Sequence, residues 1–141
     1  TDRFFVVGVN ALGSCHGSTG PASRDPRTGN PYGPTFPEVT IRDIVRSQKL
    51  LLDSLGVKHL VAVCGPSMGG FQSFQWGVSY PDFMNGVVAT VTAPKMRAGT
   101  IDAVEQLRQR LASHPNWNNG WYYENGGIAS ILEEIRHETL V

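Results

Sequence analysis

The segment Gly65-Pro66-Ser67-Met68-Gly69-Gly70 constrains the fold of this chain more than any other feature. It contains the pattern G-x-S-x-G and lies between an apolar run, residues 57–64, and a segment that can form a helix. Glycines at positions 65 and 69 would let a strand and a helix approach each other closely. The pattern predicts a sharp turn that holds Ser67 in a strained conformation at the carboxyl edge of a parallel sheet, a nucleophile elbow.

Because the chain has 16 glycines in 141 residues, this pattern can also arise by chance, so the flanking sequence has to support it. Residues 40–43 have the form of a capping box, and apolar residues then follow helical spacing as far as Gly56. Residues 57–64 are rich in β-branched residues and too short for a helix. They predict a strand that is buried on both faces.

The sequence after the turn completes the expected order of elements. Residues 71–80 can form a helix that ends near Pro81, and residues 86–92 are a second β-branched run. A strand, a helix and a strand in this order predict a right-handed parallel crossover. The chain is therefore predicted to have an α/β fold.

The amino-terminal part predicts a further strand over the apolar residues 4–9, followed by a loop over residues 10–17. In acyl transfer through a serine ester, two backbone N–H groups commonly stabilise the oxyanion. The N–H of Met68, next to the proposed nucleophile Ser67, is one candidate, and Leu12 in the amino-terminal loop is the second.

The remaining segments leave alternatives open. Residues 13–37 are dense in Gly, Pro, Ser, Thr and Asn, which predicts a long loop that is either an irregular connection or the rim of an active site. A helix is expected from Gly99 and another from Ile128. These helices would form a lid over the nucleophile or simply cover a sheet face. We assign residues 1–95 to a core and residues 96–141 to the lid.

The composition fits an ordinary soluble domain. Twelve basic residues balance twelve acidic ones, and no apolar run approaches the ~18 residues of a membrane span. Nucleic acid and membrane are therefore poor partner hypotheses. The two cysteines, Cys15 in a loop and Cys64 at a buried strand end, show no spacing typical of a metal site or a disulfide framework. We expect no metal, no bound cofactor and a cytoplasmic location.

A serine nucleophile needs a base, and the sequence offers no clear one. Only His114 and His137 follow Ser67, and both fall among the expected lid helices. These two, like His16 and His59, are interpreted as surface or lid histidines. Since a fold of this type commonly needs roughly 200–250 residues, we expect the chain to be truncated.

Many spaced segments fit one known family. The match is dense from residue 4 to about 95, with segments such as residues 10–15, 17–21, 40–43 and 65–70, and it continues more thinly through residues 108–109, 115–117 and 120–123. On these residues the chain resembles the homoserine O-acetyltransferases, acyltransferases of the α/β-hydrolase superfamily. The resemblance implies a mostly parallel sheet flanked by helices, with the beginning of a helical lid.

The resemblance also implies a ping-pong reaction in which Ser67 takes an acetyl group from acetyl-CoA and passes it to homoserine or a similar amino alcohol. Leu12 and Met68 would hold the oxyanion, and the lid would exclude water. The implied partners are these small molecules and a second copy of the chain in a homodimer, with a role in methionine biosynthesis. The base and its acid would lie in the C-terminal part of the family's fold. An esterase with water as acceptor and a non-catalytic fragment remain as alternatives.

Two departures from the family pattern concern the substrate. Pro66 stands where the family usually has glycine, and proline removes an N–H. The family binds the amino-acid carboxylate with a lid arginine and a tyrosine, whose positions fall on Leu132 and Thr139 here. Arg136 is nearby and is the candidate carboxylate ligand, with a solvated helix charge as the alternative.

Overall fold

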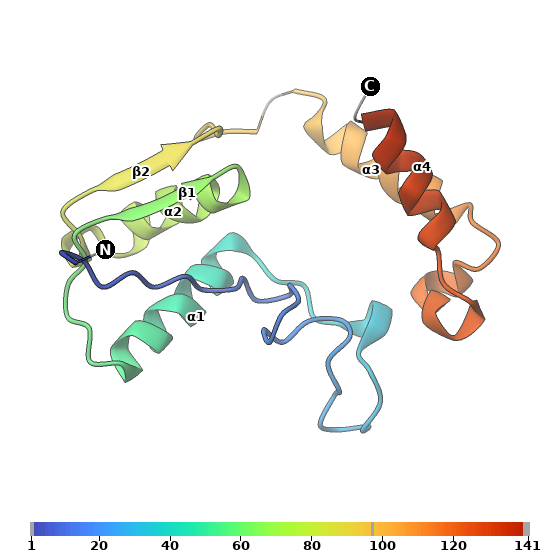
Figure 1. Cartoon of the computed structure of the whole chain (residues 1–141), viewed down its shortest axis with the longest axis horizontal. Coiled ribbons are helices and arrows are strands. Elements are labelled where there is room, and N and C mark those ends of the chain that lie inside the picture. Colours follow the sequence, from blue (N-terminus) through green and yellow to red (C-terminus); the bar gives the residue numbers. More distant parts are fainter. Residues whose placement is uncertain (1, 97, 140–141) are drawn as a thin grey trace. The chain divides into compact units, whose positions relative to one another are not determined.

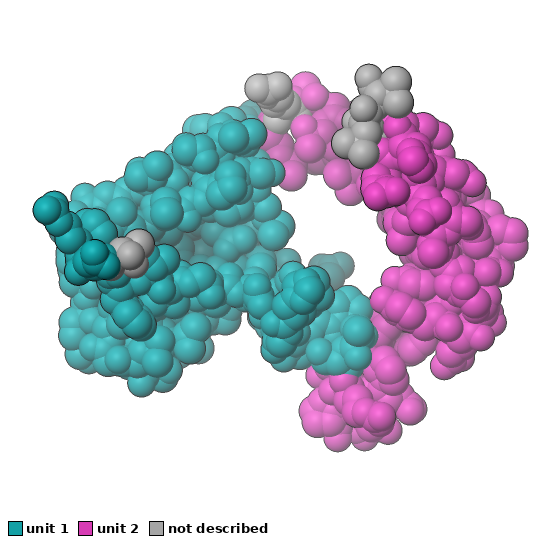
Figure 2. All heavy atoms as spheres, viewed as in Figure 1, with its two compact units in different colours: residues 1–23, 37–95 teal, residues 24–36, 96–141 magenta. Residues whose placement is uncertain are grey.

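The computed structural model describes residues 2–96 and 98–139 and divides into two compact units, which Figure 2 colours separately. Unit 1 comprises residues 1–23 and 37–95, and unit 2 comprises residues 24–36 and 96–141. One boundary between the units lies after residue 95, and the assignment of residues 96–141 as a lid stays a prediction. Residues 24–36, expected in the core, belong instead to the second unit.

Unit 1 is a parallel strand–helix–strand arrangement preceded by a helix (Figure 1). The strands pair in parallel, with Val63 opposite Val87 and Pro66 opposite Thr90. The connecting helix packs against both strands, and the preceding helix packs against it. This confirms the predicted α/β order of elements. The elements are α1 (Ile41–Ser54), β1 (Val63–Pro66), α2 (Met68–Ser79), a short 3-10 helix (Pro81–Phe83) and β2 (Val87–Thr90).

Helix α1 begins where the capping box predicts. The Thr40 side chain accepts a hydrogen bond from the Asp43 N–H (3.2 Å), and the Asp43 carboxylate accepts one from the Thr40 N–H (3.0 Å). Two of the unpaired donors at the helix start are satisfied in this way. The helix buries one face, made of Ile44, Val45, Gln48 and Leu52.

The core of unit 1 lies where α1, α2 and the segments before the strands meet. Its buried members are Val45, Leu52, Trp76 and Met84. The Trp76 ring stacks on Phe83 at a centroid distance of 5.9 Å, and this aromatic pair closes the end of α2 over the core.

The structure corrects two strand predictions. Residues 57–64 do not form one strand buried on both faces: β1 begins only at Val63, Val61 is 60% exposed and Cys64 is exposed. Residues 4–9 form no strand, and Phe5 is 84% exposed. A strand requires a neighbour for its ladder and a layer on each buried face. Among the described residues β1 pairs with β2 alone, so these requirements are not met.

Unit 2 contains the two expected helices, each within two residues of its predicted start. The Arg110 guanidinium joins them by donating a hydrogen bond of 2.8 Å to Glu138. No helix among the described residues is long and apolar enough to cross a membrane. The elements are α3 (Thr100–Ala112), α4 (Ala129–Thr139) and three short 3-10 helices, Gly33–Thr35, Asn118–Gly120 and Tyr122–Asn125.

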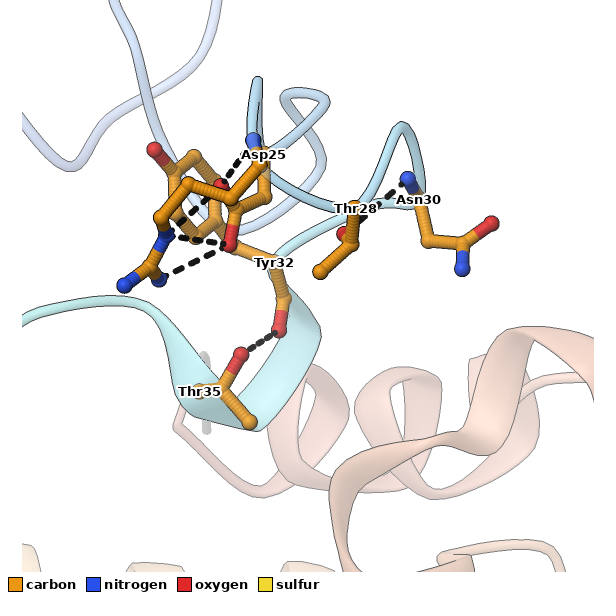
Figure 3. A network of polar contacts seen from close by, with 6 residues as sticks. Asp25, Thr28, Asn30, Tyr32 and Thr35 are labelled. Atoms are coloured by element: carbon orange, nitrogen blue, oxygen red, sulfur yellow. Dashed lines mark hydrogen bonds and ion pairs between the residues drawn. The ribbon is translucent and has the colours of Figure 1, made fainter.

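The segment of residues 24–36 is an ordered turn (Figure 3). The buried Asp25 carboxylate accepts hydrogen bonds from the Arg27 backbone N–H (2.9 Å) and from the Arg27 guanidinium (2.8 Å). The side-chain hydrogen bond from Arg27 lowers the pKa of Asp25 from its ordinary value. Gly33 lies against the Trp121 ring so closely that a Cβ there would be 2.7 Å from a ring carbon. About half of the loop expected over residues 13–37, namely residues 24–36, therefore belongs to unit 2 and packs against its other residues.

Candidate active site

Ser67 lies between the last residue of β1 and the first residue of α2, with φ 50° and ψ −117°. This conformation is unfavourable for a residue with a side chain, and such strain persists only where the surroundings hold it. The strained backbone predicted for Ser67 is thus present. Its role as a nucleophile remains a prediction.

Hydrogen bonds hold Ser67 on both sides. Its N–H donates to the carbonyl oxygen of Thr90 at the end of β2 (2.9 Å). Its own carbonyl accepts the N–H groups of Gly70 (2.9 Å) and Phe71 (3.2 Å), which begin the hydrogen-bond pattern of α2. The turn is therefore tied to both strands and to the helix.

Close approach of strand and helix depends on Gly65 and not on Gly69. A Cβ on Gly65 would lie 2.6 Å from the carbonyl carbon and oxygen of Gly69, a contact that only glycine avoids. A Cβ on Gly69 would have Pro66 Cδ at 3.5 Å as its nearest neighbour, which is an ordinary contact. The expectation that position 69 also needs glycine for close approach is wrong, because a side chain there would meet the end of β1 only at an ordinary contact distance.

The register of the strands explains why Pro66 is tolerated beside the serine. The N–H groups of Val63 and Ser67 donate to the carbonyls of Gly86 and Thr90 in the β2 segment. Since N–H groups alternate in direction along a strand, the nitrogen of Pro66 faces away from β2. Its missing N–H removes no hydrogen bond between the two strands.

The two oxyanion candidates both carry N–H groups without an acceptor in the described residues. Met68 is the first residue of α2, where no intrahelical acceptor exists and the helix dipole favours negative charge. Leu12 lies in a loop closed by hydrogen bonds from Gly13 N–H to Thr19 O (2.8 Å) and from Ser18 Oγ to Asn10 O (2.9 Å). Their joint action on an oxyanion stays a prediction.

No described side chain forms a hydrogen bond with Ser67 Oγ. His59 Nε2 lies 2.6 Å from Asn85 Oδ1, and both residues precede the strands, at the opposite end of the sheet from Ser67. His114 Nδ1 accepts the Asn116 N–H within unit 2 (3.1 Å). His16 and His137 are exposed. No base for Ser67 is assigned among the described residues, and its position in the C-terminal part of the family's fold stays a prediction.

The lid residues considered for the substrate carboxylate are exposed. Leu132 and Arg136 both lie on the surface of α4, and Arg136 has no partner among the described residues. Arg108 instead pairs with Glu105, and this hydrogen bond lowers the pKa of Glu105 to about 2. The side chain of Thr139 lies outside the described part of the chain. Carboxylate binding by Arg136 remains a prediction.

The cysteines and acidic groups add no further chemistry to the site. Cys15 and Cys64 are both free thiols, and Cys64 is exposed, where the sequence suggested a buried strand end. Within residues 2–96 and 98–139, no three His, Cys, Asp or Glu side chains gather as they would around a metal ion.

The strand expected over residues 86–92 ends at Thr90, so sequence reasoning missed the turn at the end of β2, residues 90–92. Val91 has φ 50°, and Thr92 packs against Gly70 in the first turn of α2. The available signal was the second glycine after the serine, because G-x-S-x-G requires glycine at position 69 and gives no reason for another at position 70.

Comparison of the chain with known protein families agrees with this strand–turn–helix arrangement. The model of the alpha/beta hydrolase fold matches residues 1–130. The chain belongs to the α/β-hydrolase fold family. The predicted fold class is thereby confirmed.

Two groups of relatives refine the assignment. The chain is 50% identical over 125 residues to a homoserine O-succinyltransferase of Alkalilimnicola ehrlichii, covering 89% of this chain and 33% of that protein. It is 47% identical over 145 residues to a homoserine O-acetyltransferase of Haemophilus influenzae, covering 99% of this chain and 40% of that protein. The resemblance to this enzyme family is confirmed, and the chain spans about a third of the length of the first of these proteins.

Solved structures of two kinds are similar in fold. The crystal structure of esterase E22 superposes with a TM-score of 0.78 and 42% identity, over 86% of this chain and 34% of that one. That of a homoserine O-acetyltransferase from Bacillus anthracis gives a TM-score of 0.71 and 34% identity, over 74% of this chain and 28% of that one.

Proposed function

We propose that the protein to which this chain belongs is a homoserine O-acyltransferase-type enzyme in which Ser67 carries the acyl group. The observation that supports this most is the strained Ser67 beside the free N–H of Met68, in a chain 47–50% identical to curated homoserine acyltransferases. Such a turn exposes the serine oxygen and keeps an oxyanion donor beside it.

In the first proposed step, Ser67 Oγ attacks the thioester carbonyl of acetyl-CoA while a base takes the serine proton. The C–S bond breaks, the sulfur receives the proton, and CoA leaves as a thiol from the acetyl-serine. The N–H groups of Met68 and Leu12 would stabilise the oxyanion. We expect the base and its orienting acid in the C-terminal part of the family's fold.

In the second proposed step, the hydroxyl of homoserine attacks the acetyl-serine. Its proton passes through the base to Ser67 Oγ, and O-acetylhomoserine leaves. Unit 2 is proposed to act as a lid that excludes water, with Arg136 as a ligand for the substrate carboxylate. We propose acetyl-CoA as a co-substrate, with no bound cofactor, and we expect the enzyme to work in the cytoplasm as a homodimer.

The donor within this proposal is acetyl-CoA. Similar curated proteins are named both homoserine O-acetyltransferase and homoserine O-succinyltransferase, so the acyl chain is the finer point to test. The succinyl group is longer than the acetyl group by a methylene and a terminal carboxylate, and competition between the two donors in one reaction measures the preference directly.

The fold comparison favours one alternative, hydrolysis of an ester through the same acyl-serine. Esterase E22 and the acetyl esterase MekB are similar to this chain, at 42% and 33% identity. In that case water replaces the amino alcohol in the second step, and the first step is unchanged.

Intact-mass spectrometry of the full-length natural protein tests both candidates. After incubation with acetyl-CoA, we expect a mass increase of one acetyl group, which disappears on addition of homoserine as O-acetylhomoserine forms. An adduct that is lost equally fast in buffer alone would instead identify a hydrolase.

Two serine variants test the nucleophile. The Ser67→Ala variant should form no adduct, while Ser54→Ala, at an exposed position in α1, should be labelled like the natural protein. An adduct retained by Ser67→Ala would place the nucleophile elsewhere.

A further inference from the structure

The turn after β2 holds the Ser67 turn from both ends. Thr90 accepts the N–H of Ser67 (2.9 Å), as described above. The carbonyl of Ser67 accepts the N–H of Gly70, and Gly70 in turn packs against Thr92. Residues 90–92 therefore reach the serine along two routes, one through a hydrogen bond and the other through a packing contact.

The contact between Thr92 and Gly70 is tight. A Cβ on Gly70 would lie 2.2 Å from Thr92 Cγ2 and 2.7 Å from Thr92 Cβ, so the helix can approach only because position 70 has no side chain. Val91 adopts φ 50° between Thr90 and Thr92, although β-branched residues strongly disfavour that region. With its own side chain 86% exposed, Val91 gains nothing from packing, so the strain is maintained by its two neighbours.

The methyl group of Thr92 packs against Gly70, but this contact does not explain why the side chain also carries a hydroxyl. Its Oγ1 atom is buried, and it has no hydrogen-bond partner among the described residues. Burying an unpaired hydroxyl is destabilising compared with a valine of the same shape, which would make the same methyl contact with Gly70. A hydrogen bond from this hydroxyl to a further polar group would remove that cost.

We infer that Thr92 is a positioning residue for Ser67, whose methyl group fixes Gly70 and whose hydroxyl bonds a polar protein group that completes the active site. That partner is a side-chain or backbone group that the described residues do not supply. This inference rests on the proposed role of Ser67 as nucleophile and adds a residue that the G-x-S-x-G pattern does not contain.

The test compares acyl-enzyme formation in variants of the full-length natural protein, with p-nitrophenyl acetate as donor and no acceptor. Thr92→Val removes the hydroxyl and keeps the shape, so we expect the saturating acylation rate to fall about tenfold or more with little change in KM. Thr92→Ser keeps the hydroxyl and should stay within about threefold of the natural rate. Ser54→Ala is the control, because it removes an exposed hydroxyl from α1 and should acylate at the natural rate.

Natural acylation rates in Thr92→Val, or a change in KM alone, would overturn the inference. If Thr92→Val does not fold, Thr92→Ala and Thr92→Ser form a second pair that both lack the methyl group and differ only in the hydroxyl. Serine should then acylate about tenfold faster than alanine, and equal rates would refute the role of the hydroxyl. Absence of any acyl-enzyme in the natural protein would overturn the proposed function itself. This outcome differs from failure of the Thr92 inference, because it is seen in the natural protein without any substitution.

Discussion

The indole Nε1 of Trp76 donates a hydrogen bond of 2.8 Å to Oε1 of Gln48, and both side chains are buried between α1 and α2. The amide nitrogen of Gln48 in turn donates to Oε1 of Gln72 (2.7 Å). The glutamine therefore uses both ends of its amide to join the two helices. Since α2 begins at Met68, this polar chain also fixes the helix that follows the serine.

Replacing Gln48 by leucine should leave the Trp76 N–H buried without an acceptor. We expect the free energy of unfolding of the full-length protein to fall by about 1–3 kcal/mol, measured by urea denaturation. Thr40 takes no part in the hydrogen bonds of Gln48. The loss of unfolding free energy in Gln48→Leu should therefore add to the loss in a Thr40 variant when the two substitutions are combined. Adding Trp76→Phe to Gln48→Leu should cost less than the sum of the two single substitutions, and simple additivity would contradict the interaction.

The Thr40→Ala substitution should weaken the start of α1 by about 1 kcal/mol. The hydrogen bond from the Thr40 side chain is the main cause that lowers the pKa of Asp43 below 3.8, followed by that from the Thr40 backbone N–H. Because the folded pKa is depressed, this stabilisation is fully present above pH 3.8 and is lost as the pH falls through the lower folded value. Titration by NMR should show the pKa of Asp43 rising part of the way toward 3.8 in the variant, and an unchanged pKa would refute the assignment.

The two glycines of the G-x-S-x-G pattern should respond in opposite ways. Gly65→Ala places a methyl group 2.6 Å from the Gly69 backbone, so we expect about 1–3 kcal/mol of destabilisation and loss of the acyl-enzyme. Gly69→Ala meets no atom closer than 3.5 Å and lies in a helix, so stability should be unchanged or rise by up to about 1 kcal/mol. Equal stability of the two variants in thermal unfolding would contradict the described packing.

Val91 offers a stabilising substitution. Asparagine tolerates positive φ far better than valine, and the valine side chain is 86% exposed, so Val91→Asn should add about 1 kcal/mol of stability. Val91→Ile keeps the β-branch and should give no gain. Calorimetry of the two variants measures the difference, and a gain in the isoleucine variant would point to packing instead of backbone strain.

Features governed by neighbours in sequence were predictable. The capping box at Thr40 and Asp43 and the strained turn at Ser67 follow from short patterns whose cause is local. Residues 4–9 and the burial of Val61 were predicted wrongly, because strand pairing and burial depend on partners that the local pattern does not contain.

The same reasoning explains the site residues that were missed. The contact of Thr92 with Gly70 joins the end of β2 to the start of α2, and the distance between these residues in sequence hides it. The extra glycine at position 70 was the one sequence feature that indicated this contact.

Unit 2 is assembled from two separate stretches of chain, since Gly33 and Pro34 lie against Trp121 and Gly120. An exchange of this region between related enzymes must therefore transfer two pieces. A chimera that receives residues 96–139 without residues 24–36 would bring the Trp121 ring to a foreign loop, where any side chain at position 33 would collide with it. Recombination or grafting of unit 2 of this chain must therefore transfer the turn that carries Asp25 and Arg27 together with the helices that follow residue 96.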